Sequence, residues 1–188
     1  MTIAEFIQKL AADPVYLIAQ ILGIIAVIFT FLSYQAKTQR KLIIVQSAAT
    51  LVFSIHYLML GAIAGAILNL VCIIRNFVYC NRGVKIFANK YVPYVLAVVI
   101  AALGALSWQG LPTVLLMVAL MINTVVMSMD DAQLLRKSIL LTSSMILIYD
   151  IIIVSIGGSI NESIAIISSV IGIIRYRNSA RSVAEEEI

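Results

Sequence analysis

Seven apolar runs, each close to the length of one membrane crossing, fill most of this chain, and the charged residues fall mainly between them. The hydrocarbon core of a bilayer is roughly 30 Å thick and requires about 20 apolar residues in a helix. The predicted spans are 15–35, 41–60, 63–80, 91–107, 112–129, 137–156 and 162–177. Backbone polar groups inside lipid must be paired within the protein, so these runs predict an all-α integral membrane protein with seven transmembrane helices.

The composition excludes an ordinary soluble domain. Hydrophobic residues make up 62% of the chain and charged residues 12%, and the mean hydropathy is +1.07. A soluble domain carries about 25% charged residues. The net charge of +4 comes from residues between the apolar runs, so it does not predict a nucleic-acid partner. The expected partners are the lipid bilayer and an unknown small polar solute, and a homo-oligomer is compatible with the sequence.

The distribution of Lys and Arg predicts the orientation. If the first span enters from outside, only Lys9 of the 13 basic residues stays outside. Cytoplasmic connections of membrane proteins carry an excess of basic residues. We therefore expect a multi-pass protein with a periplasmic N-terminus and a cytoplasmic C-terminus. Arg75 and Arg175 fall at cytoplasmic helix ends, where their side chains are expected to extend to the lipid headgroups. The cytoplasmic residues are Lys37, Arg40, Lys41, Arg75, Arg82, Lys85, Lys90, Arg136, Lys137, Arg175, Arg177 and Arg181.

An internal repeat explains the odd number of spans. A shift of 96 positions aligns Arg40-Lys41 with Arg136-Lys137 and Ser54 with Asp150. Two three-helix units in the same orientation need one inverting helix between them, a pattern known from transporters built of parallel repeats. The predicted organisation is 3+1+3, two parallel three-helix bundles joined by a linker helix. Its parts are an outer segment 1–14, a first bundle 15–80, a linker helix 91–107, a second bundle 112–177 and a cytoplasmic tail 178–188.

Polar residues inside the spans are the candidate site residues, because lipid makes each of them costly. Asp150 is the one acidic residue well inside an apolar run, and it suits either a capped structural role or ligand or proton coupling. Asn69 suits either an interhelical hydrogen bond or a polar, uncharged substrate. His56, the single histidine, is either a packing residue or a proton or ligand contact. The residues expected to line a substrate cavity are Ser54, Asn69, Asn123, Tyr149, Asp150 and Ser168.

The sequence lacks the patterns of a metal site or an enzyme. No further His, Cys or Asp stands at metal-ligand spacing around Asp150 or His56. The sequence also has no Ser-His-Asp order, no glycine-rich phosphate loop and no HExxH motif. We therefore expect no metal, no cofactor, no catalytic residues and no enzymatic activity.

The run GIIAVIFTFLSYQAKTQRKLIIVQSAATLVFSIHYLMLGAIAGAILNLVCIIRNFVY resembles bacterial inner membrane proteins of the YgjV type. That family is distantly similar to the PQ-loop, SWEET and PnuC transporter superfamily. The resemblance implies a SWEET-like 3+1+3 fold in the bacterial inner membrane. Two features depart from the superfamily: Ser33-Tyr34-Gln35 and Ser128-Met129-Asp130 lack the proline of the Pro-Gln pair. Asn69 matches the substrate-holding asparagine of the first unit, whereas Ser168 or Ser169 stands there in the second.

Two functional hypotheses follow. The first is a small-solute transporter or facilitator, in which one bundle rocks against the other around a polar site. The second is a non-transport protein on the same scaffold, such as a receptor, an interaction partner or a lipid-handling factor. The resemblance admits the second because the KDEL receptor shares the superfamily's architecture. A polar cavity between the bundles favours transport, and a solid bundle favours the alternative.

Overall fold

The computed structural model describes residues 3–36, 39–129 and 131–186, and the regular elements among them are all helices. This confirms the expectation of an all-helical chain for the described part. The first two and last two residues of the predicted terminal segments, as well as Lys37 and Asp130, lie outside the described residues. The helices are α1 (Ile3–Ala12), α2 (Pro14–Tyr34), α3 (Gln39–Met59), α4 (Ile63–Cys80), α5 (Val92–Leu106), α6 (Leu111–Val126), α7 (Ala132–Ile152) and α8 (Ile156–Glu186).

Two aspartates define where long helices begin. The Asp13 carboxylate accepts hydrogen bonds from the backbone N–H groups of Val15 (3.0 Å) and Tyr16 (3.1 Å) at the start of α2. Pro14, which has no N–H to lose, occupies the first turn of α2. Asp131 caps α7 in the same way. These short side chains pair backbone donors that the helix itself leaves free.

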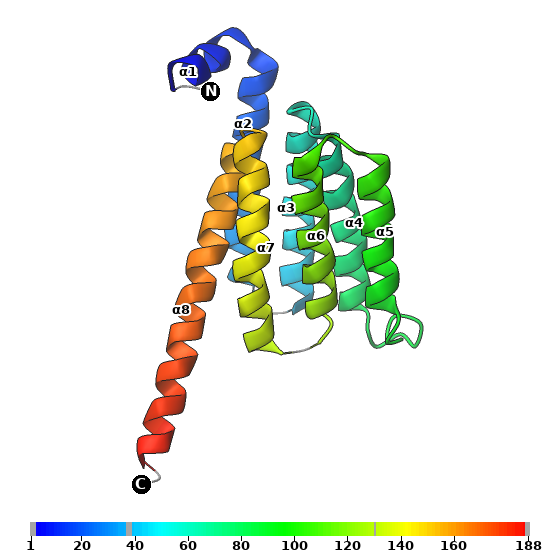
Figure 1. The fold of residues 1–188 in the computed structure, drawn as a ribbon, viewed down its shortest axis with the longest axis vertical. Helices are drawn as coiled ribbons and strands as arrows, with labels where there is room; N and C mark the ends of the chain where they lie inside the picture. The colour runs from blue at the N-terminus through cyan, green and yellow to red at the C-terminus, as the bar shows by residue number, and fades with distance from the viewer. Residues whose placement is uncertain (1–2, 37–38, 130, 187–188) are drawn as a thin grey trace.

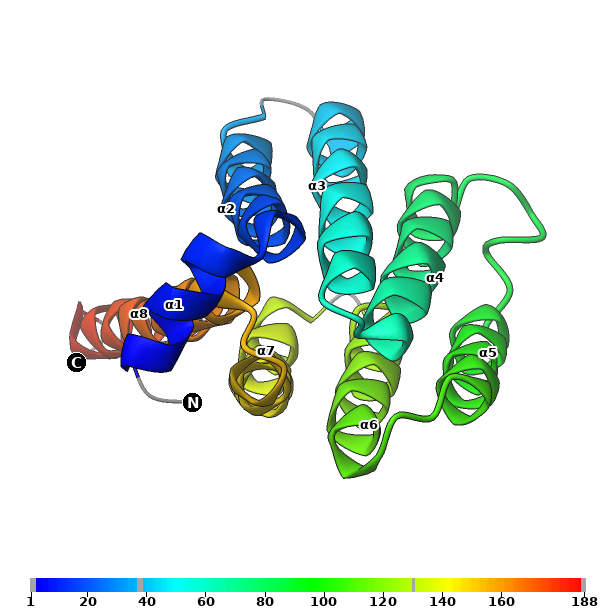
Figure 2. The ribbon, with the colours of Figure 1, turned by 90° about the horizontal axis from the view of Figure 1, so that it is seen from above.

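Helices α2 to α8 run up and down side by side, and α1 lies across the top of the bundle (Figure 1). Seen from above, α2, α3 and α4 form one row, and α8, α7 and α6 form a second row facing it (Figure 2). Consecutive helices within each row are in contact, and the rows meet where α2 packs on α8 and α4 on α6. Helix α5 packs outside this arrangement, against α6 and α4.

The surfaces of the bundle are suited to lipid. Three stretches are long and apolar enough to cross a membrane by length and composition: Pro14–Ser33, Ile63–Cys80 and Ile156–Arg177. Shorter apolar helices cover Ile43–Met59, Val92–Leu106 and Leu111–Val126. Large apolar side chains are exposed on several helices, and a soluble monomer rarely exposes so many. Examples are Ile28, Leu58, Val98, Leu106, Ile151 and Ile167.

The turn between α7 and α8 differs from the sequence prediction. The seventh span was predicted to begin at residue 162, after a break in the GGSIN segment, but α8 begins at Ile156. The break lies earlier, at Val154, whose φ of 58° is unusual for a β-branched residue. The Gln20 side chain of α2 stabilises this turn. It donates to the Val154 carbonyl (2.7 Å) and accepts from the Ile156 N–H (3.1 Å).

Helices α2 and α8 approach each other closely just after this turn. A Cβ atom placed on Gly157 would lie 2.5 Å from the Gly23 Cα, so the two backbones are in direct contact. Small residues allow this approach between membrane helices. The contact fixes the start of α8, and with it the side chains that α8 presents to the interior.

Candidate functional site

A cavity of about 380 Å³ is lined by residues from both rows of helices and so lies between them. This volume is within the range of small-molecule sites, roughly 300 to 1,000 Å³. All six helices of the two rows contribute to its wall, and each supplies at least one polar side chain. One such residue from each of α2, α3, α4, α6, α7 and α8 is, in that order, Thr30, Thr50, Asn69, Asn123, Ser143 and Asn161.

Asn69 and Asn123 line this cavity from α4 and α6. Asn69 donates one hydrogen bond, from Nδ2 to the Gly65 carbonyl at 2.8 Å. Its side-chain oxygen takes no hydrogen bond from another described residue. The Asn123 side chain likewise forms no hydrogen bond with any part of the chain that the structure describes. An amide carries both donors and acceptors, so these two side chains can hold water or a polar solute in the cavity.

Arg75 is a charged wall residue, whereas its position in the sequence predicts a side chain that extends to the lipid headgroups. In the structure it is buried, with 8% of its surface exposed, and it lines the cavity. Its Nη2 and Nε lie 3.2 and 3.4 Å from Asn76 Oδ1, and its Nη1 lies 3.4 Å from Thr124 Oγ1. The apolar run continues past Arg75 to Tyr79, so α4 keeps this arginine one turn inside the bundle instead of at its end.

Glu162 is a second charged wall residue, and it is not among the site residues predicted from the sequence. It lines the cavity from α8 and accepts a hydrogen bond from Asn161 Nδ2 at 3.0 Å. Ser143 of α7 lines the same cavity. A span starting at residue 162 placed Glu162 at a helix end, where an acid is unremarkable. The actual start at Ile156 moves it about 9 Å along the helix.

Asp150 lies directly behind the cavity wall. The Tyr57 hydroxyl, from a residue that lines the cavity, donates to Asp150 Oδ1 at 2.7 Å. Asp150 is fully buried, and its Oδ2 has no hydrogen-bond partner among the described residues. A Cβ on Gly158 would lie 2.5 Å from this carboxylate, so only glycine leaves room for it there. Asp150 therefore acts on the cavity through Tyr57.

Three further predicted site residues are not among those that line the cavity. Ser54 is buried and donates to the Ala66 carbonyl at 2.8 Å, joining α3 to α4. Tyr149 is buried with its hydroxyl packed against Gly65. Ser168 is exposed on α8, whereas its neighbour Ser169 is buried. Successive helix residues point about 100° apart, so a one-residue ambiguity in the repeat alignment is enough to move a side chain off the interior face.

His56 joins three parts of the chain. It is fully buried, and its Nδ1 lies 2.6 Å from the Ala19 carbonyl of α2. Its Nε2 lies 2.7 Å from Ser155 Oγ, in the turn before α8. Since both ring nitrogens are engaged and the ring is not part of the cavity wall, the packing interpretation of His56 fits this geometry.

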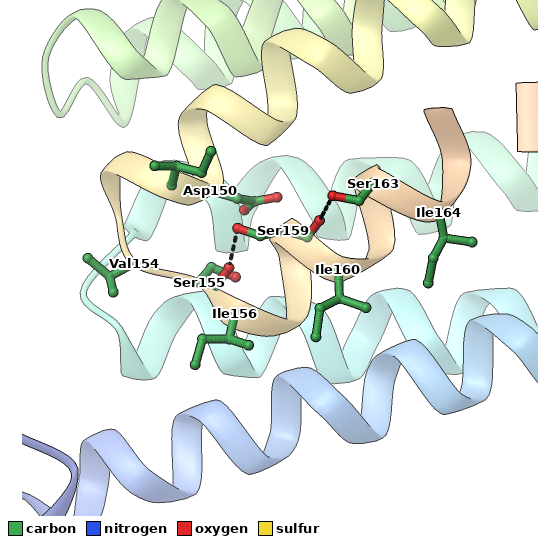
Figure 3. A pocket seen from close by; sticks show the side chains of 9 residues that line it. Asp150, Val154, Ser155, Ile156, Ser159, Ile160, Ser163 and Ile164 are labelled. Atoms are coloured by element: carbon green, nitrogen blue, oxygen red, sulfur yellow. Dashed lines mark hydrogen bonds between the residues drawn. The ribbon is translucent and has the colours of Figure 1, made fainter. Parts of the chain in front are cut away.

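A separate groove of about 440 Å³ lies between the end of α7 and the start of α8. Asp150 lies along it, and isoleucines make up much of its wall (Figure 3). The hydroxyl of Ser159 donates to the carbonyl of Ser155, just before α8, and that of Ser163 to the carbonyl of Ser159, both at 2.7 Å. Because these serine hydroxyls are already paired with backbone carbonyls, the groove offers mainly apolar surface.

The match to known families agrees with the apolar helices. A family model of bacterial inner membrane proteins, YgjV, matches residues 17–180. The chain belongs to the YgjV family. This confirms the resemblance to YgjV-type proteins and the inner membrane location. No curated protein and no solved structure shows a significant match.

Proposed function

We propose that this YgjV family protein is a transporter or facilitator of a small polar solute, and not an enzyme. The observation that carries the proposal is the polar cavity between the two rows of helices. Polar and charged side chains in a membrane protein are costly unless they face protein or a water-filled space. Here all six helices of the two rows direct polar groups to one space large enough for a small solute.

We also propose the finer architecture: seven transmembrane helices in a 3+1+3 arrangement, a periplasmic N-terminus and a cytoplasmic C-terminus. The repeated contacts support it, because α2–α3–α4 and α6–α7–α8 pack in the same order. The repeat relates α2 to α6 and α4 to α8, so it maps the α2–α8 contact onto the α4–α6 contact. The loop with Arg82, Lys85 and Lys90 lies at the lower end of the bundle, opposite α1 (Figure 1). Reporter fusions after α2, α4, α6 and α8 test this topology, and an active periplasmic alkaline phosphatase at any of them contradicts it.

The arrangement also supports a likeness to SWEET and PQ-loop transporters, with a difference in how the bundles move. Neither Ser33 nor Ser128 is followed by the proline that hinges the first helix in that superfamily. Rocking of the two rows would then pivot at the α2–α8 and α4–α6 contacts, where the rows meet. The solute would be held near Asn69 and Asn123, between these two lines of contact.

Uptake into proteoliposomes tests the function. A radiolabelled panel of sugars, nucleosides and amino acids is offered to vesicles with wild-type protein, Asn123→Ala, or the matched control Ser168→Ala. We expect saturable uptake by wild type that Asn123→Ala lowers about two- to tenfold, the cost of one or two lost hydrogen bonds. Ser168→Ala, on the exposed face, retains full uptake. Equal uptake by wild-type and empty vesicles for every solute contradicts the proposal and favours a receptor or lipid-handling role.

A further inference from the structure

Arg75 carries a permanent positive charge into the cavity. A guanidinium is not deprotonated in proteins, and a buried charge is ordinarily paired with an opposite one. The described residues give Arg75 no carboxylate partner. Its hydrogen bonds go to the neutral oxygens of Asn76 and Thr124 at 3.2 to 3.4 Å, longer than the 2.7 to 2.9 Å typical of charge-assisted bonds. The cavity therefore has an unmet preference for an anion at this side.

Glu162 presents the complementary group from the other row. Its carboxylate accepts a hydrogen bond from Asn161 Nδ2 at 3.0 Å, and Ser143 of α7 lines the same cavity. A carboxylate has about four lone-pair sites, so acceptor capacity remains on the cavity side. Tyr57, the hydroxyl that bonds to Asp150, lines the same cavity, so a second acid lies one side chain away. This side of the cavity is rich in acceptors and prefers a cation.

The two groups lie at different depths. Helices α4 and α8 both begin at the upper end of the bundle (Figure 1). Arg75 is twelve residues into α4 and Glu162 six residues into α8. At 1.5 Å per residue, Arg75 lies roughly 9 Å deeper than Glu162. Helices α4 and α8 also stand at opposite ends of the two rows (Figure 2). A solute that meets both groups at once carries its two charges at opposite ends of an elongated skeleton.

We infer that the cavity binds an elongated zwitterion, with its carboxylate or other oxyanion on Arg75 and its ammonium on Glu162. That this binding serves transport rests on the proposed function, whereas the binding itself can be tested without it. Asn69 and Asn123 line the space between the charged ends and hydrogen-bond the polar middle of the solute. The charge pattern separates this solute class from sugars, which present no charge to either residue.

Thermal shift of the purified protein in detergent tests the binding. Three probes, 5-aminopentanoate, pentanoate and pentylamine, share a five-carbon chain and differ in charge, and glucose is the uncharged polar probe. A ligand that binds the folded state alone raises stability in proportion to its occupancy. We expect 5-aminopentanoate to raise the melting temperature and the other three to do so only at about tenfold higher concentration or more. A shift with glucose that equals the 5-aminopentanoate shift overturns the inference.

Charge-neutral variants test which end of the solute each charged residue binds. Arg75→Gln and Glu162→Gln each lower the 5-aminopentanoate affinity about 10- to 100-fold, as expected for one lost charge-assisted contact. Glu162→Gln also removes the preference for 5-aminopentanoate over pentanoate, and Arg75→Gln removes its preference over pentylamine. The matched controls Arg82→Gln and Glu5→Gln, outside the cavity, leave the affinity unchanged. Where Arg75→Gln fails to fold, Arg75→Lys keeps the charge and must keep the preference over pentylamine, or the inference fails.

Two further experiments distinguish a soluble solute from a lipid headgroup, and the binding site from the transport proposal. Phosphatidylethanolamine joins an ammonium to a phosphate, so competition by this lipid assigns the same site to a headgroup in place of a soluble solute. Wild-type uptake of a neutral solute that both glutamine variants retain overturns the zwitterion site and leaves the transport proposal standing. Binding of 5-aminopentanoate without uptake in proteoliposomes has the opposite meaning: the site stands and the transport proposal fails.

Discussion

Replacing Gly157 by alanine tests whether α2 and α8 meet backbone to backbone. A Cβ at this position would lie 2.5 Å from the Gly23 Cα, where ordinary contacts are 3.4 to 4 Å. The Gly23 carbonyl carbon would lie still closer, so one helix must retreat by roughly 1 Å, since backbone cannot rotate away as a side chain can. A gap of that size removes a quarter to a half of the dispersion energy of each contact across the seam. We expect Gly157→Ala to cost about 1–3 kcal/mol of unfolding free energy.

Thermal unfolding in detergent, followed by size-exclusion fluorescence, measures this loss. Gly83→Ala is the matched control, because a Cβ there meets nothing within 4 Å. Its melting temperature should equal that of the wild type. The Gly157 substitution should also weaken the Gln20 contacts at the start of α8, and the sensitivity of the α7–α8 turn to proteinase K, which cleaves after apolar residues, would report this. Equal melting temperatures for the two alanine variants would refute the close approach of α2 and α8.

Three other predictions concern stability. Hydrogen bonds from the Leu134 and Gln133 N–H groups lower the pKa of Asp131, so its stabilising effect is present above pH 3.8, the usual aspartate value, and fades as the pH falls further. The melting temperatures of wild type and Asp131→Ala should therefore differ at pH 7 and approach each other as the pH falls below 3.8, and a constant difference contradicts this. Tyr57→Phe should lower the unfolding free energy by about 1–3 kcal/mol, because Asp150 loses its hydrogen-bond donor. If Tyr57→Phe lowers the unfolding free energy by the same amount in an Asp150→Leu background, the two side chains are not coupled. Val154→Gly should raise the unfolding free energy by about 0.5–1 kcal/mol, because the relief of left-handed strain exceeds the entropy cost of glycine; a lower melting temperature argues against strain at this turn.

The helices were predictable from the sequence because lipid imposes a simple rule on apolar length. The predicted span 15–35 corresponds to α2 (Pro14–Tyr34), and the span 91–107 to α5 (Val92–Leu106). The start of α8 was not predictable, because a valine takes the left-handed conformation that normally signals glycine. Gln20, which lies 134 residues earlier in the chain, stabilises that turn. Local sequence carries no trace of such a contact.

The candidate site was predictable only in part for the same reason. Asn69 and Asn123 could be selected because amides are rare in apolar runs, and both line the cavity. Arg75 and Glu162 were passed over because each fell near the end of a predicted span, where charge is common. Their burial depends on the tertiary position of α4 and α8. Asp150 attracted attention as an isolated acid, yet its contact to the cavity passes through Tyr57.

Side-resolved thiol labelling tests the central claim, a water-filled cavity within the bundle that opens to either side of the membrane. A single Asn123→Cys is placed in a Cys72→Ala, Cys80→Ala background, and a small membrane-impermeant thiol reagent is added to right-side-out or inverted vesicles. Ile100→Cys, at a fully buried position of α5 outside the cavity wall, is the control. We predict labelling of Asn123→Cys from both sides and none at Ile100→Cys. Labelling of neither cysteine from either side would contradict the cavity and the transport function proposed for it.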